Sequence, residues 1–214
     1  MTDTILTYDI AVKSAFVYEV LGQQPQRQFA LALAERVKTA FREKLLNKET
    51  GEIKGGTQTG QAMAIYYGML TVEEKPKALK LLIKYIADED GHFYTGVLGG
   101  RVLYRVLAEN GYVDLAYNMI VRPDYPSYGN WIKRGATTLW EGFYPEGGRV
   151  LSLNHHFWGD VSAWFYTYLA GIKINPTGRD VTNVDIAPLF PEKLNSVCAH
   201  YDTPNGKIAI NWER

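Results

Sequence analysis

A glutamate that directly follows a tryptophan is the residue best suited to chemistry in this sequence. The stretch GATTLWE at residues 135–141 places Glu141 next to Trp140, after a run of small and β-branched residues. Hydrolysis of a glycosidic bond typically needs two carboxyl groups, one to protonate the leaving oxygen and one to activate water or attack the sugar. Aromatic rings stack on the apolar faces of sugars, so Trp140 can line the same pocket. Glu141 is therefore a candidate catalytic carboxylate, whereas the simpler interpretation is a solvated loop glutamate.

Other catalytic chemistries lack the residue patterns that they need. None of the four histidines, His92, His155, His156 and His200, has the spacing to other His, Cys or carboxylate residues that a zinc site requires. The Gly-Gly pairs lack the strand–glycine–helix setting of a phosphate-binding loop, and no Gly-x-Ser-x-Gly motif occurs. We therefore expect neither a metal nor a nucleotide cofactor.

The composition argues against several broad classes of partner. Among 214 residues, 23 Lys and Arg balance 23 Asp and Glu, so no net charge attracts nucleic acid or an anionic membrane. No stretch approaches the roughly 18 uninterrupted apolar residues of a membrane span. The N-terminal segment MTDTILTYDI has no signal-peptide pattern, so we expect a cytoplasmic location for the chain as given. The single cysteine, Cys198, is expected to be a small buried residue.

The first two thirds of the chain are expected to be helical. Apolar residues recur at helical spacing, Pro25 suits the first turn of a helix, and Thr71 with Glu74 forms a capping-box pattern. The predicted helices span about residues 4–21, 25–46, 57–70, 71–91, 97–109, 112–121 and 156–171. An irregular, aromatic-rich stretch at 122–152 precedes the last of them. Successive helices joined by short turns suit a toroid or a solenoid, and the lack of a fixed-period repeat favours the toroid.

The remainder of the chain has the composition of strands and turns. Residues 172–214 are rich in proline and in short alternating runs, and Asn205-Gly206 is expected in the turn of a β-hairpin. Two strands alone are marginally stable. We interpret this region either as the first strands of a larger β-domain or as a small β-unit that packs on the helices.

Several blocks of this sequence together resemble one enzyme family. Besides GATTLWE, they are SLNHHFWGDVSAWFYTYLAGI at 152–172, Thr57-Gln58-Thr59, HFYTGVLGG at 92–100, LAENGYVDLAYNMI at 107–120 and YPSYGNWIKRGATT at 125–138. Taken in the order in which they follow one another along the chain, these blocks are similar to bacterial α-L-rhamnosidases of glycoside hydrolase family 78. The resemblance covers nearly the whole chain, and it rests on several ordered blocks rather than on one short motif.

The resemblance implies a fold, a reaction and a set of site residues. The implied fold is an (α/α)6 toroid with a central active site, followed by a C-terminal β-sandwich. The implied reaction is inverting hydrolysis of terminal α-L-rhamnosyl residues, with one acid, one base, no metal and no organic cofactor. Glu141 matches the family's general base, and His155 matches a histidine that contacts rhamnose. Trp131, Trp140 and Tyr94 match positions on loops that border the pocket.

This sequence also departs from the family pattern. The acidic, arginine-containing motif that supplies the general acid is not found, and about seven helices are predicted where a toroid has twelve. We therefore expect a mainly α fold, with residues 1–172 as the second half of the toroid and 173–214 as the start of the β-domain. Exposed helix faces would then favour homo-oligomers. The alternatives to a rhamnosidase fragment are a sugar-binding helical module without catalysis and a helical interaction protein.

Overall fold

The computed structural model describes residues 1–149, 151–174 and 183–214. It divides into two compact units, Met1–Val106 and Leu107–Arg214, which are described separately. The first unit is helical, and the second combines helices with short antiparallel strands. The prediction of a mainly α fold followed by a few strands is confirmed. The predicted domain boundary between residues 172 and 173 stays a prediction.

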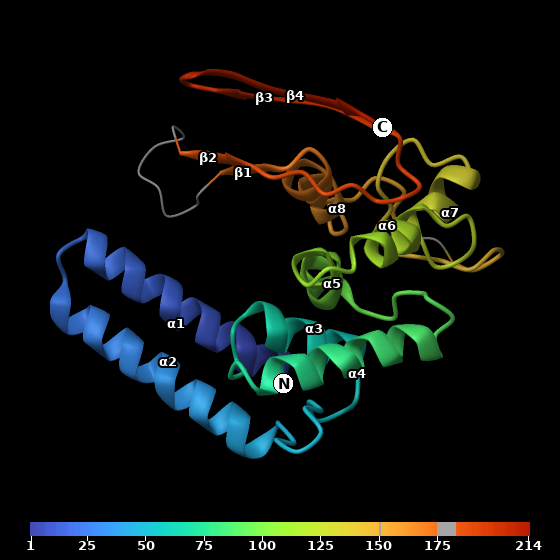
Figure 1. The fold of residues 1–214 in the computed structure, drawn as a ribbon. Coiled ribbons are helices and arrows are strands. Elements are labelled where there is room, and N and C mark those ends of the chain that lie inside the picture. Colours follow the sequence, from blue (N-terminus) through green and yellow to red (C-terminus); the bar gives the residue numbers. More distant parts are fainter. Residues whose placement is uncertain (150, 175–182) are drawn as a thin grey trace. The chain divides into compact units, whose positions relative to one another are not determined.

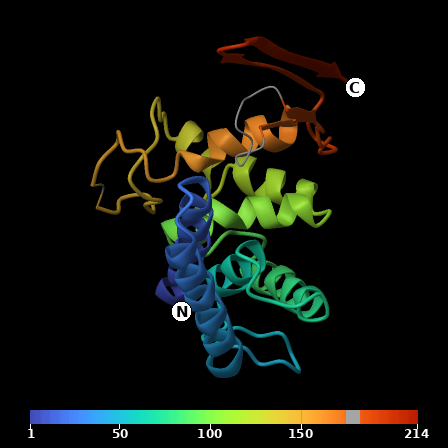
Figure 2. The same cartoon turned by 90° about the vertical axis from the view of Figure 1, so that its left-hand side faces the viewer.

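A helical hairpin begins the first unit. Helices α1 (Thr2–Val20) and α2 (Gln24–Lys44) lie side by side in both ribbon views (Figures 1 and 2). Gly22 joins them with a φ of 69°, a left-handed conformation that glycine adopts without steric cost. Buried alanines recur every four residues on each helix, at Ala11 and Ala15 and at Ala30 and Ala34. These small side chains allow two helices to approach closely.

Two shorter helices follow, and local hydrogen bonds fix where they begin. Helix α3 (Gln58–Tyr66) is capped by the Thr57 side chain, which accepts from Gly60 N. Helix α4 (Glu74–Asp88) begins at the predicted capping box: Thr71 N–H donates to Glu74 Oε2 (2.8 Å), and Glu74 N–H donates to Thr71 Oγ1 (3.3 Å). Helix α3 ends earlier than predicted because the chain turns at Gly68, whose φ is 66°.

Large apolar side chains from several segments form the core of the first unit. The fully buried ones are Ile5, Phe41, Ile53, Met63, Met69, Leu82, Ile86 and Leu103. Leu103 belongs to α5 (Val97–Glu109), which begins in the first unit and ends in the second. The loop between α4 and α5 carries Tyr94, one of the predicted site residues.

The helices of the second unit differ from the predicted ones in two places. Helix α6 (Val113–Val121) agrees with expectation. Helix α7 (Tyr128–Lys133) lies inside the stretch predicted to be irregular, where the Ser127 side chain caps it by accepting from Asn130 N. The last helix begins only at Asp160: α8 (Asp160–Trp164) continues into a π-helical turn, η1 (Phe165–Leu169), closed by a bond from Ala170 N to Phe165 O.

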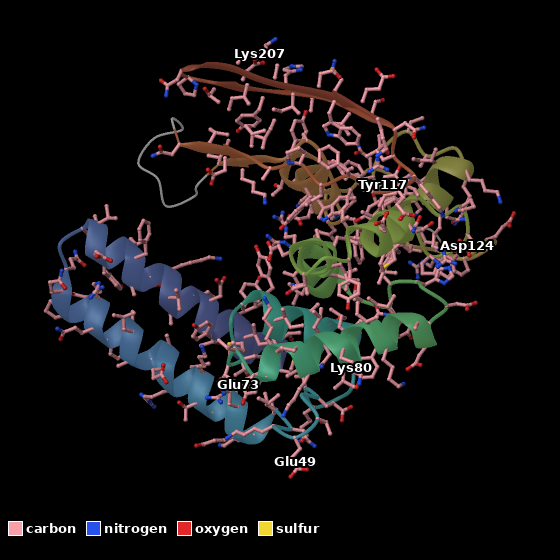
Figure 3. The ribbon with its side chains drawn as sticks, in the orientation of Figure 1. Glu49, Glu73, Lys80, Tyr117, Asp124 and Lys207 are labelled. Atoms are coloured by element: carbon pink, nitrogen blue, oxygen red, sulfur yellow. The ribbon has the colours of Figure 1, made fainter. Side chains whose placement is uncertain are left out.

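The turn between α6 and α7 is fixed by polar contacts. Asp124, which is labelled in Figure 3, accepts from Arg122 through both carboxylate oxygens, at 2.7 and 2.8 Å. The buried Ser127 hydroxyl lies 2.6 Å from Arg122 O and 2.9 Å from Asn130 N. Gly129 lies two residues after Ser127, and a Cβ there would lie 2.3 Å from Val121 O. The glycine therefore allows α7 to approach the end of α6.

Four strands form two small antiparallel sheets in the second unit. Strands β1 (Ile172–Ile174) and β2 (Val184–Ile186) pair with each other, as do β3 (Ser196–Thr203) and β4 (Gly206–Glu213). The predicted hairpin is confirmed, but its two-residue turn is Pro204-Asn205, because Thr203 pairs with Gly206. Residues 175–182 of the predicted β-domain lie outside the described residues.

The β3–β4 hairpin is attached to the helices by an indole. Trp212 Nε1–H donates to Leu169 O at 2.9 Å, and the Trp212 ring contacts Phe190 edge-on. Cys198 of β3 is exposed, so the expectation of a small buried cysteine is wrong. The physical reason is that the neighbouring elements do not cover all the side chains of this two-stranded sheet, and Cys198 is one of those left exposed.

None of the helices in the described part of the chain is both long enough and apolar enough to span a bilayer.

Candidate active site

Two segments of the second unit pair through their backbones and carry two of the predicted site residues. His155 N–H donates to Leu139 O at 2.8 Å, and Glu141 N–H donates to Ser152 O at 2.9 Å. The Thr138 hydroxyl also donates to Leu153 O. These bonds align the end of the GATTLWE stretch with the residues before α8. Glu141 and His155, 14 positions apart in sequence, therefore lie on adjacent paired segments.

A second tryptophan holds Glu141 from its carbonyl side. Trp158 Nε1–H donates to Glu141 O at 3.0 Å, and the Trp158 ring meets Phe143 edge-on at 4.9 Å between centroids. Trp158 O in turn accepts from the Tyr128 hydroxyl at 3.0 Å. Both backbone polar groups of Glu141 are thus hydrogen-bonded, which limits the positions that its partly exposed carboxylate can take. The sequence did not identify Trp158 as a site residue, although Trp158 lies within the SLNHHFWGDVSAWFYTYLAGI block that resembles the family.

Burial and charge keep the Tyr128 hydroxyl protonated. Burial raises the pKa of Tyr128 well above its usual range, and the negative charge of Asp160 raises it further. A protonated phenol remains a hydrogen-bond donor to Trp158 O at any pH near neutrality. Tyr128 therefore supports the tryptophan that holds Glu141.

The geometry at His155 defines which ring nitrogen can donate. Its Nδ1 lies 3.1 Å from Phe157 N–H and accepts from it, so a neutral His155 ring carries its proton on Nε2. The rings of His155 and His156 stack at 5.0 Å with 7° between their planes, and Phe157 contacts His155 edge-on. The partly exposed His155 can therefore donate one hydrogen bond from Nε2 to a hydroxyl group.

The two predicted tryptophans lie in an aromatic cluster. Trp131 stacks on Phe143, with centroids 4.2 Å apart, and lies 5.8 Å from Trp140. Both tryptophans are buried, and the Arg134 guanidinium lies 5.0 Å from the Trp140 ring centroid. Trp131 was expected on a loop, but it lies in α7. The cluster supports the Glu141 segment, because the Phe143 ring contacts both Trp131 and Trp158, and Trp158 bonds to Glu141 O.

An apolar cavity opens beside this cluster. It has a volume of about 520 Å³, within the range of small-molecule sites. Its walls include Trp131, Leu139, Ile132, Val161 and Phe165. The Trp131 Nε1–H is buried and has no hydrogen-bond partner among the residues that the structure describes. Glu141 does not line this cavity, although Leu139 and the threonines before it do.

Tyr94 belongs to the first unit and is considered there by itself. Its side chain is 74% exposed, although Phe93 before it is buried. In the described part of the chain, no group of three or more His, Cys, Asp or Glu side chains is placed to hold a metal ion.

Comparison with known proteins decides the family. The family described as the bacterial alpha-L-rhamnosidase 6 hairpin glycosidase domain matches residues 2–169. The chain belongs to this family. A curated alpha-L-rhamnosidase of Formosa agariphila is 34% identical over 206 residues, which are 91% of this chain and 22% of that protein. The resemblance drawn from the ordered sequence blocks is therefore confirmed.

Solved rhamnosidase structures agree in fold. The Streptomyces avermitilis alpha-L-rhamnosidase complexed with L-rhamnose superposes with a TM-score of 0.88 at 27% identity, over 99% of this chain and 21% of that one. The alpha-L-rhamnosidase from Dictyoglumus thermophilum gives a TM-score of 0.85 at 28% identity, over 97% and 23%. The chain thus spans about a fifth of the length of its rhamnosidase relatives. Its helices are part of a six-hairpin glycosidase domain.

Proposed function

We propose that this chain carries the general base of an inverting α-L-rhamnosidase, and that Glu141 is this base. The observation that carries the proposal is the anchoring of Glu141 through both of its backbone polar groups, by Ser152 O and by Trp158 Nε1. A general base must be held within hydrogen-bond reach of the water that it activates. Fixing the backbone on both sides reduces the freedom of the carboxylate before substrate arrives.

In the proposed reaction, the Glu141 carboxylate removes a proton from a water molecule. The water oxygen attacks the anomeric carbon of an α-L-rhamnoside on the face opposite the leaving group, and the glycosidic C–O bond breaks. A second carboxyl protonates the leaving oxygen. His155 Nε2–H donates to a hydroxyl of the sugar, and Trp131 and Trp140 are proposed to border the same pocket. Tyr94, considered within the first unit by itself, is proposed to contact a rhamnosyl group through its exposed ring.

The proton donor is proposed to come from polypeptide outside these 214 residues, because the acidic, arginine-containing family motif is not found in them. In inverting enzymes the two carboxyl groups lie about 6.5–9.5 Å apart, which leaves room for the attacking water. Loss of a positioned proton donor lowers the rate by about 10²–10⁴-fold. The chain alone is therefore expected to bind rhamnose but to hydrolyse rhamnosides only slowly.

The test is hydrolysis of p-nitrophenyl α-L-rhamnopyranoside together with calorimetric titration of L-rhamnose. We expect Glu141→Gln to abolish any turnover and to leave rhamnose affinity within about threefold, because the base acts on water rather than on the sugar. Glu146→Gln is the control, since Glu146 is an exposed glutamate five residues further along. His155→Ala should weaken rhamnose binding.

Product stereochemistry tests the role of Glu141 directly. Proton NMR during turnover should show β-L-rhamnose first, as inversion requires. First release of α-L-rhamnose would contradict the assignment of Glu141 as general base, and equal losses in the Glu141 and Glu146 variants would contradict its specific role.

The alternative is a sugar-binding helical module without catalysis. The missing acid motif and the aromatic cluster around Trp131 favour it. Rhamnose binding by the folded chain, without turnover even when polypeptide that carries the acidic, arginine-containing motif is supplied, would support this alternative.

We further propose that the α1–α2 hairpin mediates self-association. Ile10 and Val17 of α1 and Leu21, the residue that follows this helix, recur at helical spacing, and each is more than half exposed. Phe29 of α2 is also largely exposed. Adjacent exposed apolar side chains are typical of interfaces, so a second copy of the chain is the proposed occupant.

A further inference from the structure

The loop that carries Tyr94 combines one buried ring with one exposed ring. Phe93 is buried and contacts the Tyr104 ring of α5 edge-on, at 6.3 Å between centroids. The next residue, Tyr94, directs its side chain outward. An exposed aromatic ring on a loop normally moves freely. The backbone around Tyr94 is instead fixed by a side chain from another helix.

That side chain belongs to Gln58, the first residue of α3, which is only 3% exposed. Gln58 Oε1 accepts from Tyr94 N–H at 2.8 Å, and Gln58 Nε2 donates to His92 O at 3.0 Å. The same Nε2 also donates to Tyr85 O at 3.2 Å, at the end of α4. One amide therefore holds the backbone on both sides of Phe93 and ties it to two helices.

Close packing restricts the loop from the other side. A Cβ on Gly99 would lie 2.5 Å from Thr59 Oγ1 and 2.9 Å from Thr95 Cβ. Only a glycine at this position allows the first turn of α5 to lie so close to α3 and to the loop. The Tyr94 backbone is thus confined by Gln58, by the buried Phe93 ring and by this contact.

We infer that Gln58 is the positioning residue that holds the Tyr94 backbone, so that the exposed Tyr94 ring is presented for contact with a sugar ring. The inference rests on the proposed function, since it takes the ligand of Tyr94 to be a rhamnosyl group. A preorganised aromatic ring loses less conformational freedom on binding than a mobile one. Gln58 is buried and its three hydrogen bonds are partly buried, so losing them costs the loop backbone hydrogen bonds that solvent replaces only in part.

Helix α3 contains a matched control for this inference. Gln61, 0% exposed, makes the same pattern of bonds one turn further along. Its Oε1 accepts from Ile53 N–H at 2.7 Å, and its Nε2 donates to Gly51 O and Ala78 O at 3.0 and 3.2 Å. Gln61 therefore supports a different turn, and its removal should cost similar stability without affecting Tyr94.

The experiment combines amide hydrogen exchange with titration of L-rhamnose. In Gln58→Met we expect the Tyr94 amide to exchange at least tenfold faster and the rhamnose dissociation constant to rise about fivefold, the effect of losing one net hydrogen bond. In Gln61→Met both quantities should match those of the unsubstituted chain. If Gln58→Met does not fold, Gln58→Asn replaces it, because the amide group is kept but its shorter side chain moves the acceptor away from Tyr94 N–H.

A double-mutant cycle with Tyr94→Ala separates positioning from general stability. If Gln58 acts through Tyr94, Gln58→Met has no further effect on rhamnose affinity when Tyr94 is already alanine. Unchanged Tyr94 exchange in Gln58→Met, equal loss of affinity in Gln61→Met, or an additive cycle would each overturn the inference. If the unsubstituted chain bound no rhamnose, the proposed function would fail, and the exchange rates alone would decide whether Gln58 fixes the loop.

Discussion

The indole Nε1–H of Trp158 donates to the backbone carbonyl of Glu141 across 3.0 Å. Glu141 was predicted from the sequence as a catalytic candidate, whereas Trp158 was not predicted as a site residue. The bond connects Glu141 to the aromatic cluster, because the Trp158 ring contacts Phe143 and Phe143 stacks on Trp131. The position of Glu141 thus depends on side chains from α7 and from the turn before α8.

Removing the Trp158 hydrogen-bond donor should lower the hydrolysis that depends on Glu141 while costing the fold little stability. Trp158→Phe keeps an aromatic ring against Phe143 and loses the bond, so we expect about 1 kcal/mol less free energy of unfolding in urea. Glu141-dependent hydrolysis should fall about tenfold, since small displacements of catalytic groups are costly. Trp212→Phe is the control, because Trp212 Nε1–H also donates to a backbone carbonyl, at Leu169. An equal loss of hydrolysis in both variants would contradict the role given to Trp158.

Gly129 should be the least replaceable glycine in the segment before Glu141. In Gly129→Ala, the new Cβ would meet Val121 O at 2.3 Å and Arg122 O at 2.4 Å, so α7 must move away from α6. We expect a loss of about 3 kcal/mol in the free energy of unfolding, at the upper end for an overpacked site. Gly96→Ala should be nearly neutral, because no atom lies within 4 Å of its added Cβ. Equal thermal midpoints for the two variants would contradict this account.

The capping box of α4 should make stability depend on pH. Arg42 donates to both carboxylate oxygens of Glu74, at 2.8 and 3.2 Å, and these bonds lower the pKa of Glu74. A lowered pKa in the folded state means that Glu74 contributes fully above its unfolded pKa of about 4.3. The contribution is lost as the pH falls through the lowered value.

Glu74→Gln tests this dependence. At pH 7 we expect it to cost about 2 kcal/mol, a common value for a charge-assisted hydrogen bond. The difference between the variant and the unsubstituted chain should shrink as the pH is lowered from 5 to 3, measured by urea unfolding at each pH. Glu49→Gln, a change at an exposed turn, should show no such convergence. A constant difference across this range would contradict the account.

Self-association through α1 should be sensitive to a single charge. Val17→Glu places a carboxylate in the exposed row formed by Ile10, Val17 and Leu21, and its desolvation opposes association. We expect the dissociation constant of the oligomer, from sedimentation equilibrium, to rise at least tenfold. Val72→Glu is the control, since Val72 is also exposed but lies outside this hairpin. A chain that stays monomeric at every concentration would contradict the proposal.

Local sequence predicted the features that depend on near neighbours. The capping box of Thr71 and Glu74, the proline at the start of α2 and the hairpin of β3 and β4 were all predicted, because each is determined by residues a few positions apart. The ordered blocks around GATTLWE also indicated the family, since a resemblance of this kind depends only on the order of the residues. Glu141 and His155 followed from the same blocks, and their roles stay proposals.

The missed features depend on packing rather than on a local pattern. Helix α7 was not expected, although Ser127 caps it locally, because its position depends on the close contact of Gly129 with the end of α6. The exposure of Cys198 depends on which face of a two-stranded sheet is covered, which no local pattern encodes.

The sequence by itself therefore determined the family, the order of the helices and the candidate carboxylate. Only the tertiary structure decided what holds the candidate residues in place: Trp158 is 17 positions from Glu141, and Gln58 is 36 positions from Tyr94. The physical reason is that a side-chain amide or indole bonds to whichever backbone group the fold brings within about 3 Å. Sequence spacing does not specify that group until the helices have packed.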